Sequence, residues 1–259
     1  MAGLEPVVLA GLALLGVAAG IGITAVGPGG VLITVGLFAF TGLPPSQVAG
    51  TAIVTNVATG LLGTAVYTRS GQLREASTRR TAALLAGGAV VGTPLGVLAN
   101  GLVTGRVFGV LLGTFVALVA VLVLWRRPPA PQPGDGPPAA GGLGWPAAVA
   151  VGAGVAVAGA MFGVGGPLLS VPLLVALGMP VLPALAAAQA QSVVIAGIGT
   201  VGYVAADAVD WPLAALMGVP ELAGVLAGWM IARAVPAAAL KGALVVSLLV
   251  LAPYVALHG

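Results

Sequence analysis

Two glycine-rich turns are the clearest chemical pattern in this sequence. Residues 27–30 read Gly-Pro-Gly-Gly and residues 163–166 read Gly-Val-Gly-Gly, and an apolar stretch follows each turn. Glycine lets the backbone turn sharply, and the first N–H groups of a helix have no partner inside that helix. Because unpaired N–H groups and the positive end of the helix dipole attract anions, both turns are candidate anion sites. The glycines concerned are Gly27, Gly29, Gly30, Gly163, Gly165 and Gly166.

Polar side chains on the segments after these turns form a second pattern. They lie in apolar surroundings, where a polar group costs free energy unless it is paired or wetted. We therefore expect them to face a protein-lined cavity and to bind a substrate there. Hydrogen bonding between helices, and close helix packing at the glycines, are the simpler alternatives. The candidate substrate-binding side chains are Thr34, Thr51, Thr55, Asn56, Ser170, Gln189, Gln191 and Ser192.

Glu221 is the only acid near the centre of an apolar segment. An ionised carboxylate at that depth costs about 2.5 to 3.5 kcal/mol on insertion scales. We expect Glu221 to be protonated, or to face a wet cavity or a bound cation, and it is our candidate proton-coupling group. A protonated packing residue is the alternative. Matching Pro94 to Pro220 pairs Glu221 with Leu95, which gives this acid no counterpart in the first half.

The composition places these groups in a membrane. Of 259 residues, 59% are hydrophobic and 6% are charged, whereas a soluble domain has roughly 25% charged residues. With a mean hydropathy of +1.17, the chain is neither a soluble enzyme nor a nucleic-acid binder. It has no Cys, and its one His is His258, so we expect no catalytic residue, no metal site and no cofactor. An intramembrane hydrolase, the enzyme alternative, would lack a histidine within any span.

Apolar runs of about 20 residues predict an all-α polytopic membrane protein, because this length spans a bilayer as a helix. We expect about eight long transmembrane helices. Two further segments reach only about 18 Å, which is marginal for crossing, so we expect them to be re-entrant or broken helices. The long segments are 6–26, 46–68, 80–99, 106–125, 146–162, 183–206, 212–232 and 237–257, and the short ones are 30–41 and 167–177.

The chain divides into two similar halves. A Pro/Gly-rich linker, 126–144, separates a first transmembrane repeat, 1–125, from a second, 145–259. When the second half is shifted by 136 positions, residues 27–67 and 163–203 align without a gap, and 13 of these 41 positions are identical. We interpret this agreement as an internal repeat. The identical pairs include Gly63 with Gly199, Thr64 with Thr200, and Tyr67 with Tyr203.

The basic residues predict how the repeats lie in the membrane. Four crossings per half divide the nine Lys and Arg residues six to three between the two sides, whereas five segments per half divide them eight to one. The positive-inside rule prefers the second arrangement, which makes the repeats inverted and puts both termini outside the cytoplasm. The basic loop 69–80 is then cytoplasmic, and Asp207 and Asp210 lie on the outer side.

These paired motifs resemble those of the TauE/SafE-type sulfite exporters. Each half of that family carries a glycine-rich turn, an apolar stretch, a Gly-hydrophobic-Pro turn and a helix of small and polar residues. The copies here read GPGGVLITVGLFAFTGLPPSQVAGTAIVTN (27–56) and GVGGPLLSVPLLVALGMPVLPALAAAQAQS (163–192), and Val209-Asp210-Trp211 opens the next span. The sequence departs from the pattern at Val31 and Pro167, at Ala186-Ala187 where the first copy has Gly50-Thr51, and at Glu221.

The resemblance implies a transporter that exports a small sulfur-containing anion, sulfite or an organosulfonate, across the bacterial inner membrane. We expect alternating access around a central anion site at the interface between the repeats. The expected partners are the anion, the lipid bilayer and protons as the coupling ion, and a homo-oligomer is left open. A carrier of another small anion, such as a carboxylate or thiosulfate, is the alternative.

Overall fold

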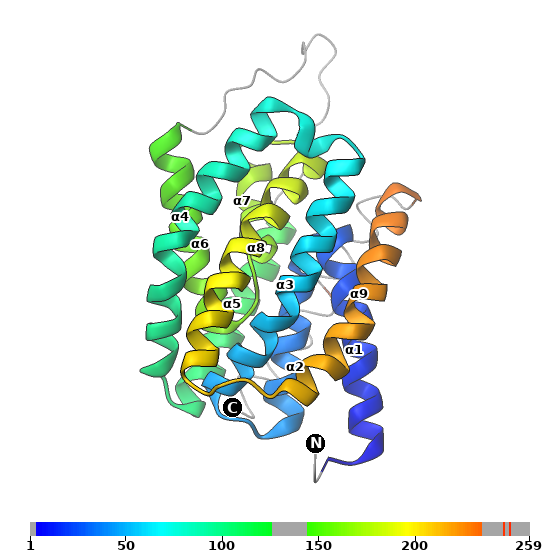
Figure 1. Ribbon diagram of the computed structural model, residues 1–259, viewed down its shortest axis with the longest axis vertical. Helices are drawn as coiled ribbons and strands as arrows, with labels where there is room; N and C mark the ends of the chain where they lie inside the picture. Colours follow the sequence, from blue (N-terminus) through cyan, green and yellow to red (C-terminus); the bar gives the residue numbers. More distant parts are fainter. Residues whose placement is uncertain (1–3, 126–143, 235–245, 247–248, 250–259) are drawn as a thin grey trace.

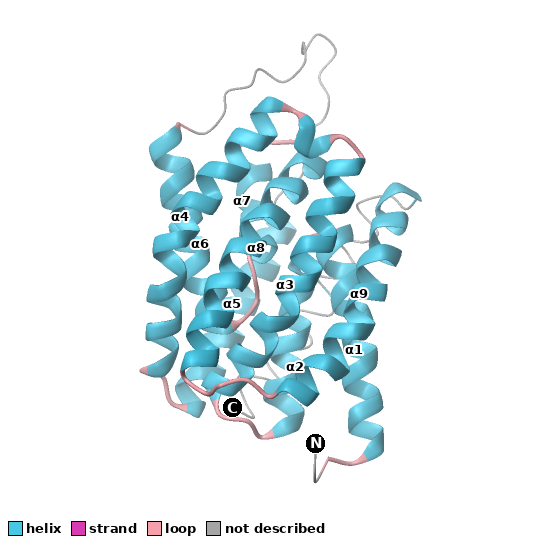
Figure 2. Ribbon diagram, in the orientation of Figure 1, coloured by secondary structure: helices cyan, strands magenta, loops and turns pink. Residues whose placement is uncertain are grey.

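The computed structural model describes residues 4–125, 144–234, 246 and 249, and this part of the chain consists of helices and connecting turns (Figure 2). Six of its helices, α1, α3, α4, α6, α8 and α9, are long and apolar enough to cross a membrane. The chain is therefore a multi-pass membrane protein. The elements are α1 (Pro6–Ala25), η1 (Pro28–Gly30), α2 (Val31–Thr41), α3 (Pro45–Arg69), η2 (Gln72–Arg74), α4 (Ala76–Gly101), α5 (Gly105–Trp125), α6 (Trp145–Phe162), α7 (Pro167–Ala176), α8 (Val181–Ala205) and α9 (Trp211–Ala234).

Helices occupy seven of the eight expected long segments and both of the expected short ones. α5, a helix of 21 residues, covers the expected segment 106–125. The segment 237–257 lies outside the described residues, so the count of eight long helices stays a prediction. The division into repeats 1–125 and 145–259 also stays a prediction, and the linker 126–144 lies almost entirely outside the described residues.

Glycines mark both ends of the short helices α2 and α7. Gly27, with a φ of 111°, precedes η1 and α2, and Gly42, with a φ of 66°, ends α2. In the second half, Gly165 precedes α7 with a φ of 70°, and Gly178 follows it with a φ of 89°. Glycine adopts positive φ without the steric cost that a side chain brings. Each short helix therefore begins at the glycine turn that the sequence singled out.

Two helix pairs pack at close range through glycine. α1 lies along α9, where a Cβ built on Gly224 would be 2.2 Å from Val17 O. α4 lies along α6, where a Cβ built on Gly92 would be 2.2 Å from Ala153 O. Only glycine allows the backbones to approach so closely. The two contacts are equivalent in the two halves. Val17 of α1 matches Ala153 of α6 with a spacing of 136 positions, and Gly92 of α4 matches Gly224 of α9 with a spacing of 132 positions.

α3 and α8 run in opposite directions through the centre of the bundle (Figure 1). Gly63, near the end of α3, packs against Gln189, in the first half of α8. Gly50, near the start of α3, packs against Tyr203, near the end of α8. The order of these contacts along the two helices requires an antiparallel crossing.

A buried tyrosine ties each central helix to the first helix of its own half. The Tyr67 hydroxyl of α3 donates to Thr24 O of α1 at 2.7 Å. The Tyr203 hydroxyl of α8 donates to Ala160 O of α6 at 2.9 Å. Both donor and acceptor positions are 136 residues apart, so the identity of these tyrosines in the alignment corresponds to one shared structural role.

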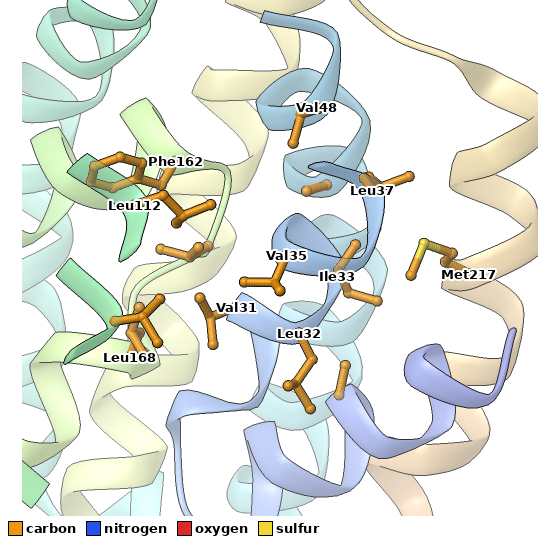
Figure 3. Packing of buried hydrophobic residues seen from close by; sticks show 14 of the residues in the cluster. Val31, Leu32, Ile33, Val35, Leu37, Val48, Leu112, Phe162, Leu168 and Met217 are labelled. Carbon is orange, nitrogen blue, oxygen red and sulfur yellow. The ribbon is translucent and has the colours of Figure 1, made fainter. Parts of the chain in front are cut away.

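The short helix α2 lies within an apolar cluster (Figure 3). Its residues Val31 and Ile33 are fully buried, and the side chains around it include Leu168 of α7, Phe162 of α6 and Met217 of α9. The side chains of such a helix offer few hydrogen-bonding groups. Its polar character is therefore concentrated at its ends, where the first N–H and last C=O groups have no partner inside the helix.

Candidate anion site

The N-terminal ends of α2 and α7 lie next to each other inside the bundle. A Cβ built on Gly30 would be 3.0 Å from Val164 O, and one built on Gly27 would be 3.1 Å from Pro167 O. All four residues are buried. Neither helix has a capping side chain, because glycine occupies the position before its first residue. Two positive helix ends without caps therefore meet at the glycine turns.

Polar side chains from α3 and α8 converge on the second turn. A Cβ built on Gly165 would be 2.8 Å from Ser192 Oγ and 3.2 Å from Asn56 Oδ1. The Gly166 N–H donates to Ser192 Oγ at 3.4 Å, and Asn56 Nδ2 donates to Gly163 O at 3.1 Å. Both side chains are 2% exposed. The structure thus brings together five residues that the sequence proposed as ligands.

Gln191 and Ser170 extend this polar cluster along α7. The Ser170 hydroxyl donates to Gln191 Oε1 at 2.5 Å, and Gln191 Nε2 donates to a backbone oxygen of α6 at 3.1 Å. Gln191 Oε1 would be 3.3 Å from a Cβ built on Gly166, so the amide borders the turn. Thr34, which aligns with Ser170, instead donates to Phe162 O at 2.9 Å. Polar side chains from both halves therefore cluster around the second glycine turn, and fewer of them lie around the first.

Three other expected ligands have different partners. Thr51 Oγ1 accepts a hydrogen bond from the Asp210 N–H at 2.9 Å, which ties α3 to the start of α9. Gln189 Nε2 donates to the backbone of α1 at 3.4 Å, and its Oε1 is buried without a donor among the described residues. A Cβ built on Gly29 would be 2.2 Å from a backbone oxygen of α1. Helix packing accounts for Gly29, and the α3–α9 contact accounts for Thr51.

Glu221 lies beside this cluster on α9. Its side chain is fully buried, and neither carboxyl oxygen has a hydrogen-bond partner in the described part of the chain. The Thr55 hydroxyl is next to this carboxyl, but it donates its one hydrogen to Ala52 O at 3.0 Å. A hydroxyl has a single hydrogen to donate, so Thr55 leaves the carboxyl without a donor. Thr55 and Asn56 are consecutive on α3, which therefore contacts both Glu221 and the glycine turns.

The expected pairing of Glu221 with Leu95 is wrong. The corresponding contacts of Gly92 and Gly224 put equivalent residues of α4 and α9 132 positions apart, which pairs Glu221 with Ala89. Both positions are fully buried. Pro94 and Pro220 are not structurally equivalent, because they lie at different positions along α4 and α9. The corresponding contacts of Gly92 and Gly224 identify the equivalent positions. The asymmetry itself holds, since only the second half carries an acid at this position.

Comparison with known protein families gives a match over most of the chain. A family model described as "Sulfite exporter TauE/SafE" matches residues 12–255 of the chain. No curated protein matches, and no solved structure matches. The matched range includes both glycine turns, the polar cluster and Glu221.

Proposed function

The chain belongs to the sulfite exporter TauE/SafE family, whose members are membrane transporters of small anions and not enzymes, and we propose that it exports sulfite or an organosulfonate across the bacterial inner membrane. The anion would bind where the N-terminal ends of α2 and α7 meet. The observation that carries the proposal is this meeting of two uncapped helix ends with the Asn56 amide and the Ser192 hydroxyl. Thr34, Thr55, Ser170, Gln189 and Gln191 stay candidate ligands around it, whereas Thr51 is held by its hydrogen bond with Asp210.

Such a site suits an oxyanion that must be bound and then released. The spans carry Lys and Arg only near their ends, so the donors would be backbone N–H groups, amides and hydroxyls. Sulfite and sulfonate groups each present three oxygens that can accept several of these bonds at once. Helix ends stabilise the charge without an opposite full charge. Release therefore does not require breaking a buried ion pair, which would cost several kcal/mol.

Asn56 would act as an exchangeable donor. Its Nδ2 donates to Ala52 O at 3.0 Å and to Gly163 O at 3.1 Å, so both amide hydrogens are used. An anion at the turn would compete with Gly163 O for one of them. Because Asn56 lies on α3 and Gly163 lies at the end of α6, this exchange would loosen a contact between the two halves.

We propose inverted repeats and alternating access on the basis of the helix contacts. α3 and α8 are equivalent in the alignment and run antiparallel (Figure 1). α1 packs along α9 and α6 along α4, so the first helix of each half lies against a helix of the other half. Equivalent helices of opposite direction are the arrangement in which one half can rock against the other around a fixed central site.

Flux of labelled sulfite into proteoliposomes tests the proposed function. We expect uptake above that of empty liposomes, and we expect an organosulfonate such as taurine to compete with sulfite more strongly than thiosulfate or acetate. Stronger competition by acetate or thiosulfate would favour the carrier for another small anion. If no sulfur oxyanion or sulfonate moves, the proposed function fails.

Replacing Asn56 with leucine should lower anion affinity about 10- to 100-fold, because a hydrogen bond to a charged group contributes about 1.5 to 3 kcal/mol. The matched control is Asn100→Leu. Asn100 Nδ2 also donates to two backbone oxygens, of Met161 at 2.8 Å and of Pro45 at 3.5 Å. Met161 precedes the second turn by two residues, but Asn100 is not among the nearest neighbours of the glycines in that turn. Both variants should lose stability, since buried carbonyls are left unpaired. Sulfite binding by thermal shift should weaken only in the Asn56 variant, and equal weakening in both would make Asn56 a packing residue.

Single cysteines in this Cys-free chain test the membrane topology. The inverted arrangement puts Arg74 and Arg126 in the cytoplasm, and Asp207 and His258 outside. An impermeant thiol reagent applied to intact cells should therefore label cysteines at the last two positions and not at the first two. Parallel repeats would put positions 74 and 207 on the same side, so equal labelling of these two would contradict the inverted arrangement.

A further inference from the structure

An open pocket of about 530 Å³ lies at the end of the bundle where the chain turns from α3 into α4. Arg74, Arg79, Thr64 and Thr68 line it, together with alanines of α4 and Ala190 of α8. The alanines are small, and so they leave the space that the arginine side chains border. The pocket therefore combines two positive side chains and two hydroxyls with an apolar wall.

The polar groups of this pocket have unused hydrogen-bonding capacity. No acid lines it, and within the described residues neither Arg74 nor Arg79 forms an ion pair. Thr64 Oγ1 is buried and has no hydrogen-bond partner in the same set of residues. Thr68 donates its hydroxyl hydrogen to Thr64 O at 2.7 Å, so Thr64 is the hydroxyl that is free to donate. A buried unpaired hydroxyl beside two guanidinium groups is the donor set that an oxyanion requires.

The pocket adjoins the helices of the central site. Ala190 lies between Gln189 and Gln191 on α8. Gly63, which precedes Thr64 on α3, would place a Cβ 2.9 Å from Gln189 Oε1. The wall of the pocket and the polar cluster at the glycine turns are therefore built from the same stretches of α3 and α8.

We propose that this pocket is a second anion site, an entrance in which an oxyanion with two or more oxygens binds between Arg74 and Arg79 before it reaches the glycine turns. The inference rests on the proposed function and adds to it a binding step at the cytoplasmic end of the protein. Guanidinium groups bind two oxygens at once in a planar fork, and their charge raises the local concentration of anions. A phospholipid phosphate offers the same chemistry, so the experiment has to separate a lipid from a free anion.

The equivalent end of the other half carries the opposite charge. The hydroxyl oxygen of Thr200, which aligns with Thr64, is likewise buried without a partner in the described part of the chain. The turn that follows it carries Asp207 and Asp210 in place of arginines. Fixed charges of opposite sign at the two ends change the anion's apparent affinity on each side. These charges do not change the equilibrium ratio of anion concentrations across the membrane. They change only how often the anion occupies each end of the protein.

The test compares two double variants that lose the same charge. Arg74→Gln/Arg79→Gln removes both guanidinium groups of the pocket, whereas Arg69→Gln/Arg80→Gln removes two arginines of the same loop that do not line it. Sulfite uptake is measured in inside-out membrane vesicles, which expose the cytoplasmic side. We expect the first variant to raise KM about fivefold or more with kcat nearly unchanged, since these exposed charges contribute modestly, and the second to match the wild type. Equal KM values for both variants would overturn the inference.

The lipid arm uses purified protein in vesicles of phosphatidylcholine alone and in vesicles with added phosphatidylglycerol. A free anion in the pocket predicts the same difference in KM between the two double variants in both lipids. A difference that appears only with the anionic lipid would assign the pocket to a phosphate headgroup and overturn the entrance role. Absence of wild-type sulfite flux would be a failure of the proposed function and not of this pocket alone.

Discussion

Gly165→Ala should lower anion affinity about 10- to 100-fold, the loss of one hydrogen bond to a charged ligand. A Cβ at this position would be 2.8 Å from Ser192 Oγ and 3.2 Å from Asn56 Oδ1. Real Cβ atoms do not approach another atom to 2.8 Å, so the Ser192 hydroxyl would have to move, and the Asn56 amide would have to give way by a few tenths of an ångström. Their displacement removes donors that the bound oxyanion would use. Sulfite binding to the purified variant, followed by thermal shift, measures the effect.

Gly178→Ala is the matched control for Gly165→Ala. Gly165 has a φ of 70° and Gly178 a φ of 89°, so alanine at either place costs about 1 to 2 kcal/mol of backbone strain. A Cβ on Gly178 would meet nothing within 4 Å. We expect both variants to unfold at a lower temperature and only Gly165→Ala to bind sulfite weakly. A Gly165 variant that binds as tightly as the Gly178 variant would show that the second turn serves packing alone.

The helices could be predicted from the sequence because each depends on local chemistry. Runs of about 20 apolar residues define the spans, and Gly42 and Gly178 end the short helices for a reason that the sequence displays, the ability of glycine to take a positive φ. The aligned Tyr67 and Tyr203 also proved to make corresponding hydrogen bonds. The lengths of the apolar runs, the glycine turns and the internal repeat therefore predict most of the architecture of this chain.

The candidate site could be predicted only in part, because polar residues in a membrane serve binding and packing alike. Asn56 and Ser192, two of the expected ligands, both lie against Gly165 of the second glycine turn. Thr51, which is also polar and lies on the same helix α3 as Asn56, contacts Asp210 instead. Which face of a buried helix a residue occupies depends on how neighbouring helices are rotated, and a helix that is apolar on all sides gives no signal of that rotation.

The counterpart of Glu221 illustrates a second limit. The sequence offers Pro94 and Pro220 as a natural match, yet the contacts of the surrounding glycines pair Glu221 with Ala89. The spacing between halves is 136 positions up to α8 but 132 between α4 and α9. A change of four residues is about one helical turn, which keeps the same face of the helix toward its neighbour. A gap-free alignment cannot contain this change.

Glu221→Gln should abolish the response of net anion flux to a pH gradient while leaving anion exchange intact. The Glu221 carboxyl is fully buried and accepts no hydrogen bond from the described residues, so this surrounding tolerates the neutral acid and not the carboxylate. Glutamine has nearly the same shape and remains neutral at every pH. It therefore preserves packing against α1 and α3 but cannot release a proton when the site opens to water.

Glu75→Gln is the control for this experiment, because Glu75 is an exposed acid at the start of α4. We expect net sulfite flux in proteoliposomes to follow an imposed pH gradient in the wild type and in the Glu75 variant, and to be independent of the gradient in the Glu221 variant. Exchange of labelled for unlabelled sulfite at equal pH should be similar in all three.

The position of Glu221 beside Thr55 explains how one residue can link proton release to anion binding. Helix α3 carries Thr55 against Glu221 and Asn56 against the glycine turn, so a shift of this helix changes both environments together. If net flux in the Glu221 variant still follows the gradient, Glu221 is a protonated packing residue and another group carries the coupling.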